Sequence, residues 1–393
     1  MALCAPNHKL SLISAESHAR TRRRRSSRGS GIVAMASSYD VDVVSREGGK
    51  ITFTGYEEGQ LEQPKWVGET PLSRLVGALI SFKPLYSLLK LGARRVLIST
   101  AEKKNIPWRE MTEEILESDV YKELDTIQNP SIVYPHCFKN TQLNLLTYVQ
   151  EDEDTLTESE CACIECIVIV AAAEAEAATL SMARRAIPDA SSLDEANEIL
   201  RGNWLQVIEQ HHLQYSGNSM IRDILDIGCS VGVSTGYLAD KFPSAKVTGL
   251  DLSPYFLAVA QFKEKKRSQR KNPIIWIHAN GEDTGLLSNS FDLVSMAFVL
   301  HECPEKAIVG LGKEAFRLLR PGGTIALTDN SPKSKILQEL SPVLFTLMKS
   351  TEPFLDEYYL NDLEGTLREA GFVNIQTILT DPRHRTMTAT VPH

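Results

Sequence analysis

The sequence has no long uninterrupted apolar run. Its longest apolar stretch, Leu72 to Ile98, is broken by Arg74, Lys83, Pro84, Lys90, Arg94 and Arg95. A helix that crosses a membrane needs about 20 consecutive, mostly apolar residues, so we expect no transmembrane segment. We expect a pair of helices separated at Pro84, and a peripheral membrane contact through this basic stretch is left open.

Paired cysteines are also lacking. The seven cysteines are odd in number and do not follow the pattern of a secreted, disulfide-linked protein. Three of them lie in CACIEC, from Cys161 to Cys166. Together with Cys137, that spacing would suit zinc or an iron–sulfur cluster, but the apolar run that follows favours small buried thiols. We therefore expect reduced cysteines and no metal site.

Outside the first residues, acidic side chains outnumber basic ones. Residues 1–38 carry seven basic side chains and one acidic one, whereas the whole chain of 393 residues has a net charge of −8. The rest of the chain is therefore strongly acidic, which argues against nucleic acid as a partner because phosphates are repelled. The Ser- and Arg-rich start has no continuous apolar core, and this composition is typical of an organelle transit peptide.

The chain divides into three regions by composition. Residues 1–36 are interpreted as a transit peptide, because GIVAMA resembles a stromal cleavage site; this predicts the chloroplast, with the mitochondrion or a plain disordered arm as alternatives. Residues 37–212 are mainly helical in pattern. Within them the acidic run 150–160 is expected to be disordered, and residues 137–170 show no clean period, so we interpret them as an insertion. Residues 213–393 form the third region.

From residue 221 onward, apolar segments of strand and helix type alternate. We expect strands at 224–227, 246–250, 274–278, 293–298 and 324–329, helices at 235–241, 255–266 and 306–319, and a C-terminal hairpin around the turn DPRH. Such alternation predicts an α/β fold with a mostly parallel sheet and helices on both faces. Helices are also expected at 108–127, 171–187, 194–212 and 361–370.

The stretch ILDIGCSVG, from Ile224 to Gly232, joins the first expected strand to a helix through a glycine turn. In open α/β sheets, ligands bind beyond the carboxyl ends of the strands. A dinucleotide-binding turn would place glycines at 228, 230 and 233. Here only Gly228 fits, since Ser230 and Val233 occupy the other positions, so an NAD-linked oxidoreductase is poorly supported.

The pattern D-x-G-x-S-x-G resembles the fingerprint of class I S-adenosylmethionine-dependent methyltransferases. Asp226, Gly228 and Gly232 match it, and Ser230 stands where the family has its middle glycine. The resemblance implies S-adenosyl-L-methionine as cofactor, with Asp226 on the side of its amino group. Asp251, 19 residues after Gly232, would then accept the ribose hydroxyls, next to Leu252.

Later motifs extend the resemblance over about residues 221–330. In HANGEDTGLLSNSFDLVSMAFVLHECP, Asn280 stands where relatives hold the adenine amino group, and the Gly281 N–H would address the adenine ring. Ala297 stands where a backbone carbonyl meets the methionine part. RLLRPGG matches the family's turn into the fifth strand. The nearest branch contains the ubiquinone and menaquinone C-methyltransferases.

The resemblance implies a Rossmann-like seven-stranded sheet, mostly parallel with an antiparallel C-terminal hairpin, preceded by a mainly helical region that covers the substrate. It also implies a small-molecule methyl acceptor, which we expect to be prenylated or aromatic. A non-catalytic cofactor-binding protein on the same scaffold is the alternative from another functional class.

Three residues are candidates for catalysis. His301 follows the fourth strand, where the transferred methyl should lie, and is the first candidate for a general base; a purely structural histidine is the alternative. Tyr358 and Tyr359 are candidates to cap the pocket, where an aromatic face would attract a sulfonium. Core packing is the alternative role for at least one of them.

Overall fold

The structure is a computed structural model that describes residues 56–68, 70–132, 158–217, 220–267 and 270–393. The predicted transit peptide 1–36 lies outside the described residues, as does most of the acidic run 150–160. All described residues belong to a single structural unit, Asp42–His393. None of the helices in this described part is long and apolar enough to cross a bilayer.

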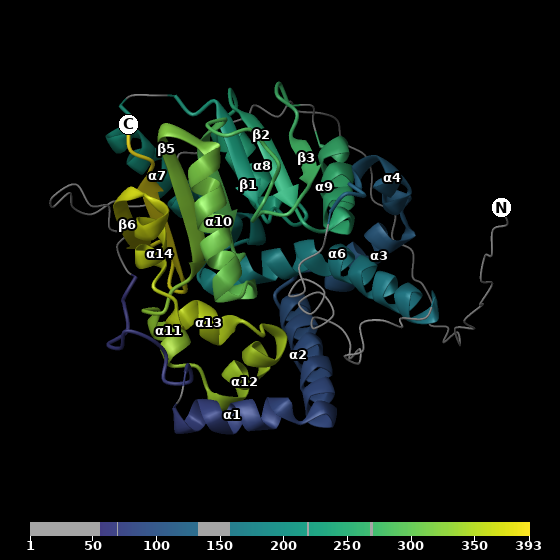
Figure 1. The fold of residues 1–393 in the computed structure, drawn as a ribbon. Helices are drawn as coiled ribbons and strands as arrows, with labels where there is room; N and C mark the ends of the chain where they lie inside the picture. Colours follow the sequence, from purple (N-terminus) through teal and green to yellow (C-terminus); the bar gives the residue numbers. More distant parts are fainter. Residues whose placement is uncertain (1–55, 69, 133–157, 218–219, 268–269) are drawn as a thin grey trace. The chain divides into compact units, whose positions relative to one another are not determined.

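Seven strands form one mixed sheet in the order β3-β2-β1-β4-β5-β7-β6 (Figure 1). Their bounds are β1 Asp223–Ile227, β2 Lys246–Asp251, β3 Ile275–His278, β4 Phe291–Ala297, β5 Leu319–Asn330, β6 Val373–Leu379 and β7 His384–Thr390. The first five strands are parallel to one another, while β7 pairs antiparallel with both β5 and β6. The predicted sheet with its antiparallel hairpin is thereby confirmed, with β6 at one edge and β3 at the other.

Helices precede, connect and follow the strands. The bounds before the sheet are α1 Pro71–Ser81, α2 Lys83–Lys103, α3 Trp108–Glu117, η1 Val120–Glu123, α4 Leu124–Ile127, α6 Glu158–Ala186 and α7 Leu193–Tyr215. Those within the sheet region are α8 Val233–Lys241, α9 Pro254–Lys266, η2 Leu300–Glu302, α10 Glu305–Leu318, α11 Lys335–Gln338, α12 Pro342–Thr351, α13 Leu355–Leu360 and α14 Leu363–Ala370. The predicted break at Pro84 is confirmed, since α2 begins with this proline in its first turn.

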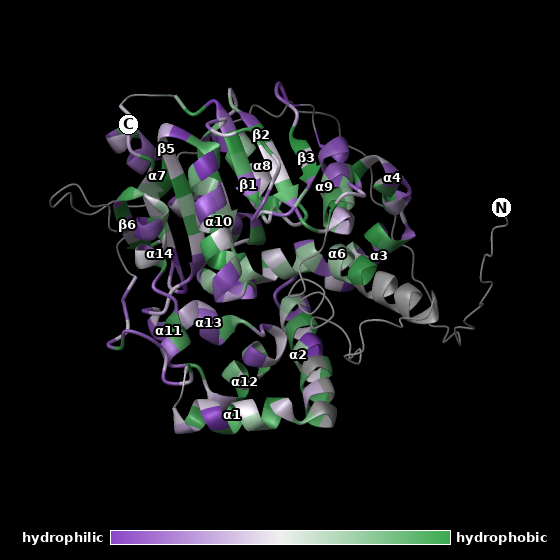
Figure 2. Ribbon diagram, in the orientation of Figure 1, coloured by the Kyte–Doolittle hydropathy of each residue, from purple (hydrophilic) through white to green (hydrophobic). Residues whose placement is uncertain are grey.

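Both faces of the sheet are covered by helices. Along β1, Ile224 belongs to the apolar core shared with α7 and α8, whereas Leu225 and Ile227 belong to the larger core shared with α10 and α14. The alternation follows from the two-residue period of a strand. Figure 2 shows the corresponding pattern, with apolar residues along the strands and mixed polar and apolar residues around α10. Strands buried on both faces are typical of parallel sheets.

A helical layer lies beyond the carboxyl ends of β4 and β5. The segment between β5 and α14 forms α11, α12 and α13, and α12 packs against α1 and α2 (Figure 1). Trp66 joins this layer to the body, because its Nε1 donates a hydrogen bond of 2.9 Å to the Leu337 carbonyl. Its ring stacks on Phe345 and meets Tyr359 edge-on. Segments far apart in sequence therefore cover the edge where the parallel strands end.

The prediction of one continuous helix at 108–127 is wrong. The structure breaks it after Glu117 into α3, η1 and α4. The Ser118 hydroxyl donates to the Ile115 carbonyl at 2.6 Å and accepts from the Val120 N–H at 3.3 Å. A serine side chain that bonds nearby backbone groups competes with helical hydrogen bonds, which the hydrophobic period alone did not reveal.

Two other helix boundaries differ from the predicted ones. α6 begins at Glu158 rather than at residue 171, so residues 158–170 are helical although their sequence shows no clean period. The alanine-rich part that follows consists of strong helix formers, from which a helix extends at low cost. α14 begins at Leu363, because the Asp362 carboxylate accepts from the Gly365 N–H at 2.9 Å and caps the first turn.

Candidate active site

The turn between β1 and α8 requires residues that tolerate positive φ. Gly228 has φ +72° and Gly232 has φ +77°, while Ser230 has φ +50°. A Cβ atom on Gly232 would lie 2.5 Å from the Trp276 ring. The Gly228 and Cys229 N–H groups both donate to the Leu250 carbonyl, at 2.8 and 3.0 Å. The turn is therefore fastened to the end of β2, and glycine is needed at 232 for both conformation and space.

Asp251, the last residue of β2, contacts this turn directly. Its Oδ2 accepts a hydrogen bond of 2.8 Å from the Ser230 N–H, and its Oδ1 accepts one of 2.8 Å from the Ser253 N–H. Burial raises the pKa of Asp251 to about 6, while these backbone bonds oppose the rise. A carboxylate has about four lone-pair positions, so two hydroxyl groups of a ligand can still be accepted.

Asp226 lies at the same turn but faces helix α8. Its Oδ2 accepts a hydrogen bond of 2.7 Å from the Thr235 hydroxyl, and the side chain is buried. Burial raises the pKa of Asp226 to about 6, and the charge of Asp251 adds to the rise. The two carboxyl groups are therefore close enough for the charge of Asp251 to affect the pKa of Asp226. Asp226 also holds the first turn of α8 through Thr235. Its contact with an amino group stays a prediction.

The residues expected around an adenine lie after β2 and β3. Asn280 accepts a hydrogen bond of 3.1 Å from the Glu282 N–H through its Oδ1, so part of its acceptor capacity holds its own turn. Gly281 is tightly enclosed, because a Cβ atom there would lie 2.7 Å from Ile227 Cγ2. Leu252 is half-buried beside Asp251. The turn after β3 is therefore tightly packed, and position 281 has no room for a side chain.

His278 is a residue of this region that the sequence did not single out. Its Nε2 donates to the Leu252 carbonyl at 3.0 Å, while its Nδ1 accepts from the Asn129 N–H at 2.8 Å. These two partners define the tautomer with the proton on Nε2. The buried imidazole links the segment after α4 to the end of β2, and only the approach of these distant segments could reveal it.

At the end of β4 the backbone is strained. Phe298 has φ +62°, a region that aromatic residues rarely occupy. Its N–H donates to the Thr328 carbonyl at 2.7 Å, and its ring meets the edge of the His384 ring at 5.0 Å. Ala297, expected near the methionine part of the cofactor, directly precedes this bend. The bend turns the chain away from the sheet toward η2.

His301 in η2 forms a buried pair with Asp329 at the end of β5. The distance from His301 Nδ1 to Asp329 Oδ1 is 2.7 Å, and the exposed fractions of the two side chains are 14% and 3%. Burial lowers the pKa of His301, but the charge and hydrogen bond of Asp329 outweigh it and raise the pKa to about 10. An imidazolium has no free lone pair, so this pairing opposes the predicted base role, which stays untested.

Tyr358 and Tyr359 lie inside α13 and are buried. The Tyr358 hydroxyl donates to the Asn330 carbonyl at 2.6 Å, and its ring centroid lies 6.4 Å from that of His301. Tyr359 packs edge-on against Trp66, at 5.3 Å between centroids. The structure therefore brings the three predicted catalytic residues to one place, and Tyr358 is anchored to β5.

The structure adds polar residues that sequence reasoning did not assign to a site. Glu352 caps the end of α12, and Arg383 lies in the turn between β6 and β7. Both are electrostatic neighbours of Tyr359, as is Asp329. An acid ending a parallel strand was a usable signal for Asp329, but no local pattern marks Glu352.

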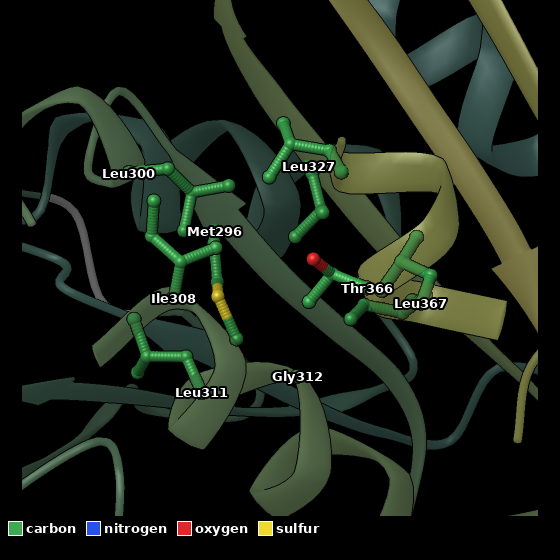
Figure 3. Close-up of a pocket in the computed structure, with 10 residues that line it drawn as sticks. Met296, Leu300, Ile308, Leu311, Gly312, Leu327, Thr366 and Leu367 are labelled. Atoms are coloured by element: carbon green, nitrogen blue, oxygen red, sulfur yellow. The ribbon is translucent and has the colours of Figure 1, made fainter. Parts of the chain in front are cut away.

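A small cavity lies elsewhere, between the sheet and helices α10 and α14 (Figure 3). Its volume is about 10 Å³, and its lining includes Met296, Leu327, Ile308 and Thr366. Figure 3 shows their side chains pointing toward one another. A space of this size with almost no polar lining is a packing gap rather than a ligand site. Among the described residues, no group of His, Cys, Asp and Glu has the geometry of a metal site.

The residues at the glycine turn fit S-adenosylmethionine. The Asp251 carboxylate retains acceptor capacity for ribose hydroxyls. The positive-φ turn between β1 and α8 lies at the carboxyl end of the sheet, where this architecture binds nucleosides. When bound, this cofactor supplies an electrophilic methyl group on a sulfonium. The chain is a class I S-adenosylmethionine-dependent methyltransferase by fold and sequence.

Comparisons with known proteins agree with this class. Residues 225–327 match the family model described as methyltransferase domain. A demethylmenaquinone methyltransferase of Lactococcus lactis is 28% identical over 208 residues, covering 48% of this chain and 80% of that protein. The mitochondrial 2-methoxy-6-polyprenyl-1,4-benzoquinol methylase of Caenorhabditis elegans is 33% identical over 123 residues, covering 30% of this chain and 41% of that protein.

Among solved structures, a SAM-dependent methyltransferase from Aquifex aeolicus is similar to this chain. It is 18% identical with a TM-score of 0.38, and the match covers 54% of this chain and 98% of that chain. The helical layer formed by α1 and α2 lies outside the residues that the family model matches.

Proposed function

We propose that this methyltransferase transfers a methyl group to a small molecule that carries a hydroxylated aromatic ring, such as a prenylated hydroquinone. The observation that carries the proposal is the cluster of side chains beyond the ends of β4 and β5, where His301, Asp329, Tyr358 and Tyr359 contact one another. Aromatic side chains pair favourably with an aromatic ring, and the buried polar groups suit hydroxyls. The names of the two quinone-methylating relatives support the same acceptor class.

A transfer assay tests this proposal. The purified full chain is incubated with methyl-labelled S-adenosylmethionine and a reduced prenylated naphthoquinone or benzoquinone that lacks the ring methyl. We expect label in the quinone fraction, and none when Asp251→Ala replaces the wild type at low cofactor concentration. A wild type that binds the cofactor but labels neither ring, nor any compound of a plastid extract, favours the non-catalytic scaffold instead.

We further propose that the protein acts in the plastid, with residues 1–36 as the transit peptide; the mitochondrion is the alternative. The basic, acid-poor composition of this segment supports the proposal. An import assay with isolated chloroplasts and mitochondria separates the two addresses. Protection and shortening of the full chain in mitochondria alone would contradict the plastid address.

A further inference from the structure

Four buried polar atoms converge at the predicted acceptor site without a hydrogen-bond partner. They are Oε2 of Glu302, Oε2 of Glu352, the Tyr359 hydroxyl and Nε of Arg383, each unpartnered within the described residues. Tyr359 is only 5% exposed, so its hydroxyl is nine-tenths buried. An isolated buried polar group costs about 1–3 kcal/mol. Four such atoms among mutually interacting side chains suggest to us a place where a polar ligand could supply the missing hydrogen bonds.

These atoms come from four segments that the fold brings together. Glu302 belongs to η2 after β4, Glu352 ends α12, Tyr359 lies in α13, and Arg383 lies in the β6–β7 turn. α13 packs directly on η2. Three of the four lie beyond the residues that match the methyltransferase family model. Most of the proposed acceptor end therefore lies outside the matched methyltransferase domain.

Glu352 is surrounded by charged groups from each neighbouring element. The groups that face it are His301 and Glu302 of η2, Asp329 of β5, Arg185 of α6, Tyr359 of α13 and Arg383 of the last turn. Burial raises the pKa of Glu352 to about 7, the cation His301 lowers it, and Glu302 and Asp329 raise it further. A general base works best when its pKa lies near the pH at which the enzyme operates.

The other candidates for a base are already engaged. His301 is held by Asp329 at 2.7 Å, and its Nε2 faces Glu302 Oε1 at 3.7 Å. The Tyr358 hydroxyl donates a hydrogen bond to the Asn330 carbonyl. We propose that Glu352 is the catalytic base that removes the proton of an acceptor hydroxyl, and that the acceptor is a phenol or hydroquinone that reacts as its anion. This inference rests on the proposed function.

The step balances without a further reactant. The acceptor O–H bond breaks, and its proton passes to Glu352. The phenolate oxygen, or the ring carbon conjugated with it, forms a new bond to the methyl carbon. The bond from that carbon to sulfur breaks, and its electron pair stays on sulfur. After attack by a ring carbon, the C–H proton passes to solvent water and the ring becomes aromatic again as a phenolate, to which Glu352 returns its proton. After attack by the oxygen, Glu352 releases its proton to solvent water.

The surrounding cations would stabilise the anion while it forms. His301 is held as an imidazolium, and Arg383 retains its unpartnered Nε. Preorganised charges and donors in an enclosed site favour a developing negative charge more strongly than water does. Tyr359 adds a neutral donor, because burial raises the pKa of its hydroxyl well above the ordinary value. His301 and Arg383 thus position and stabilise, while Glu352 moves the proton.

The test compares Glu352→Gln with wild type on two acceptors. One is a prenylated hydroquinone that is un-ionised at the assay pH, and the other is a ring-fluorinated analogue that is ionised there. We expect Glu352→Gln to lower kcat about 10²–10⁴-fold for the first acceptor and only slightly for the second. In wild type, kcat should rise with pH through about 7 as Glu352 loses its proton, and Glu352→Gln should lack this rise.

Matched variants separate chemistry from folding. Glu339→Gln, an exposed glutamate after α11, should behave as wild type, and Glu352→Asp should recover part of the rate. S-adenosylhomocysteine should bind wild type and Glu352→Gln with the same Kd. An equal loss of rate for both acceptors would overturn the base assignment. A wild type that methylates neither ring would instead overturn the proposed function and the acceptor class together.

A spectroscopic measurement tests proton transfer to Glu352 without requiring turnover, so it applies even if Glu352→Gln is inactive. 4-Nitrophenol is bound to wild type in the presence of S-adenosylhomocysteine, because its anion absorbs visible light and its neutral form does not. We expect the anion band to persist at acidic pH in wild type and to weaken in Glu352→Gln. An identical spectrum in both proteins over the whole pH range would contradict proton transfer to Glu352.

Discussion

His301 and Asp329 form a buried pair with 2.7 Å between Nδ1 and Oδ1, at the ends of two neighbouring parallel strands. Asp329 also accepts the His301 N–H at 3.3 Å through its other oxygen. Ring and backbone of His301 are therefore both fixed by one carboxylate. The pair ties η2 to β5 directly below the helical layer that covers the site.

Removing the carboxylate of this pair should destabilise the protein. Asp329→Asn leaves a buried imidazole without its counter-charge, which costs about 3–5 kcal/mol in comparable pairs. We expect a lower midpoint in urea denaturation with an unchanged slope. Asp189→Asn, an exposed aspartate between α6 and α7, serves as the control. A loss below about 1 kcal/mol would mean that the pair contributes as little as an exposed one.

The same pair predicts a loss of stability at alkaline pH. The folded-state pKa of His301 is about 10, above its ordinary value of 6.5. Its contribution is therefore complete below about pH 6.5 and is lost as the pH rises through about 10. Histidine NMR should show the His301 ring still protonated at about pH 8. A neutral ring at that pH would contradict the assignment and restore His301 as a candidate base.

Asp251 should dominate cofactor binding. Asp251→Ala removes the carboxylate that accepts from both the Ser230 and the Ser253 N–H, and with it the expected ribose contacts. Since a charge-assisted bond contributes about 1.5–3 kcal/mol, the Kd for S-adenosylmethionine should rise at least tenfold by calorimetry. Asp240→Asn on the exposed end of α8 is the control. An unchanged Kd would refute the ribose assignment.

Cofactor binding should also weaken at mildly acidic pH. The pKa of Asp251 is raised by burial to about 6, so the side chain becomes neutral as the pH falls through that value. A neutral carboxyl group is the weaker acceptor. The Kd should therefore increase between about pH 7 and about pH 5, and the increase should be smaller in Asp251→Asn. A Kd that is constant over this range would contradict the prediction.

Two substitutions in the glycine turn should differ strongly in their effect on the stability of the protein. Gly232→Ala combines a positive φ with a clash against Trp276, which predicts a loss of about 2–5 kcal/mol and weaker cofactor binding. Ser230→Gly places a glycine at a position whose φ is already positive, a conformation that glycine adopts without strain. This substitution should change the free energy of unfolding by no more than about 1 kcal/mol. Thermal unfolding with and without S-adenosylhomocysteine measures both. Trp276→Phe should recover part of the stability lost in Gly232→Ala by relieving the clash.

The cofactor half of the site could be predicted because its signals are local. A strand, a glycine turn and a helix follow one another directly between Asp223 and Lys241, and Asp251 ends the next strand. The roles of Asp226 and Asn280 were less predictable. Each side chain can accept hydrogen bonds either from a ligand or from neighbouring protein groups. In the structure Thr235 donates to Asp226 and the Glu282 N–H donates to Asn280, so part of their acceptor capacity is used.

The acceptor half could not be predicted, because its residues are distant in sequence and carry no local signature. Glu352 ends one short helix, Arg383 lies in a hairpin turn, and Trp66 comes from the start of the described chain. Their burial and pKa values depend on which neighbours approach them. Even the predicted His301 gained its partner and its charge only through β5.

The sequence by itself determined the alternation of strands and helices, the antiparallel hairpin and the glycine turn at the predicted cofactor site, since these follow from hydrophobic period and backbone conformation. Tertiary structure alone decided which carboxyls are buried together. The pKa values of these carboxyls shift because of desolvation and because of charges a few ångströms away. The residues that carry those charges belong to segments that are far apart in the sequence.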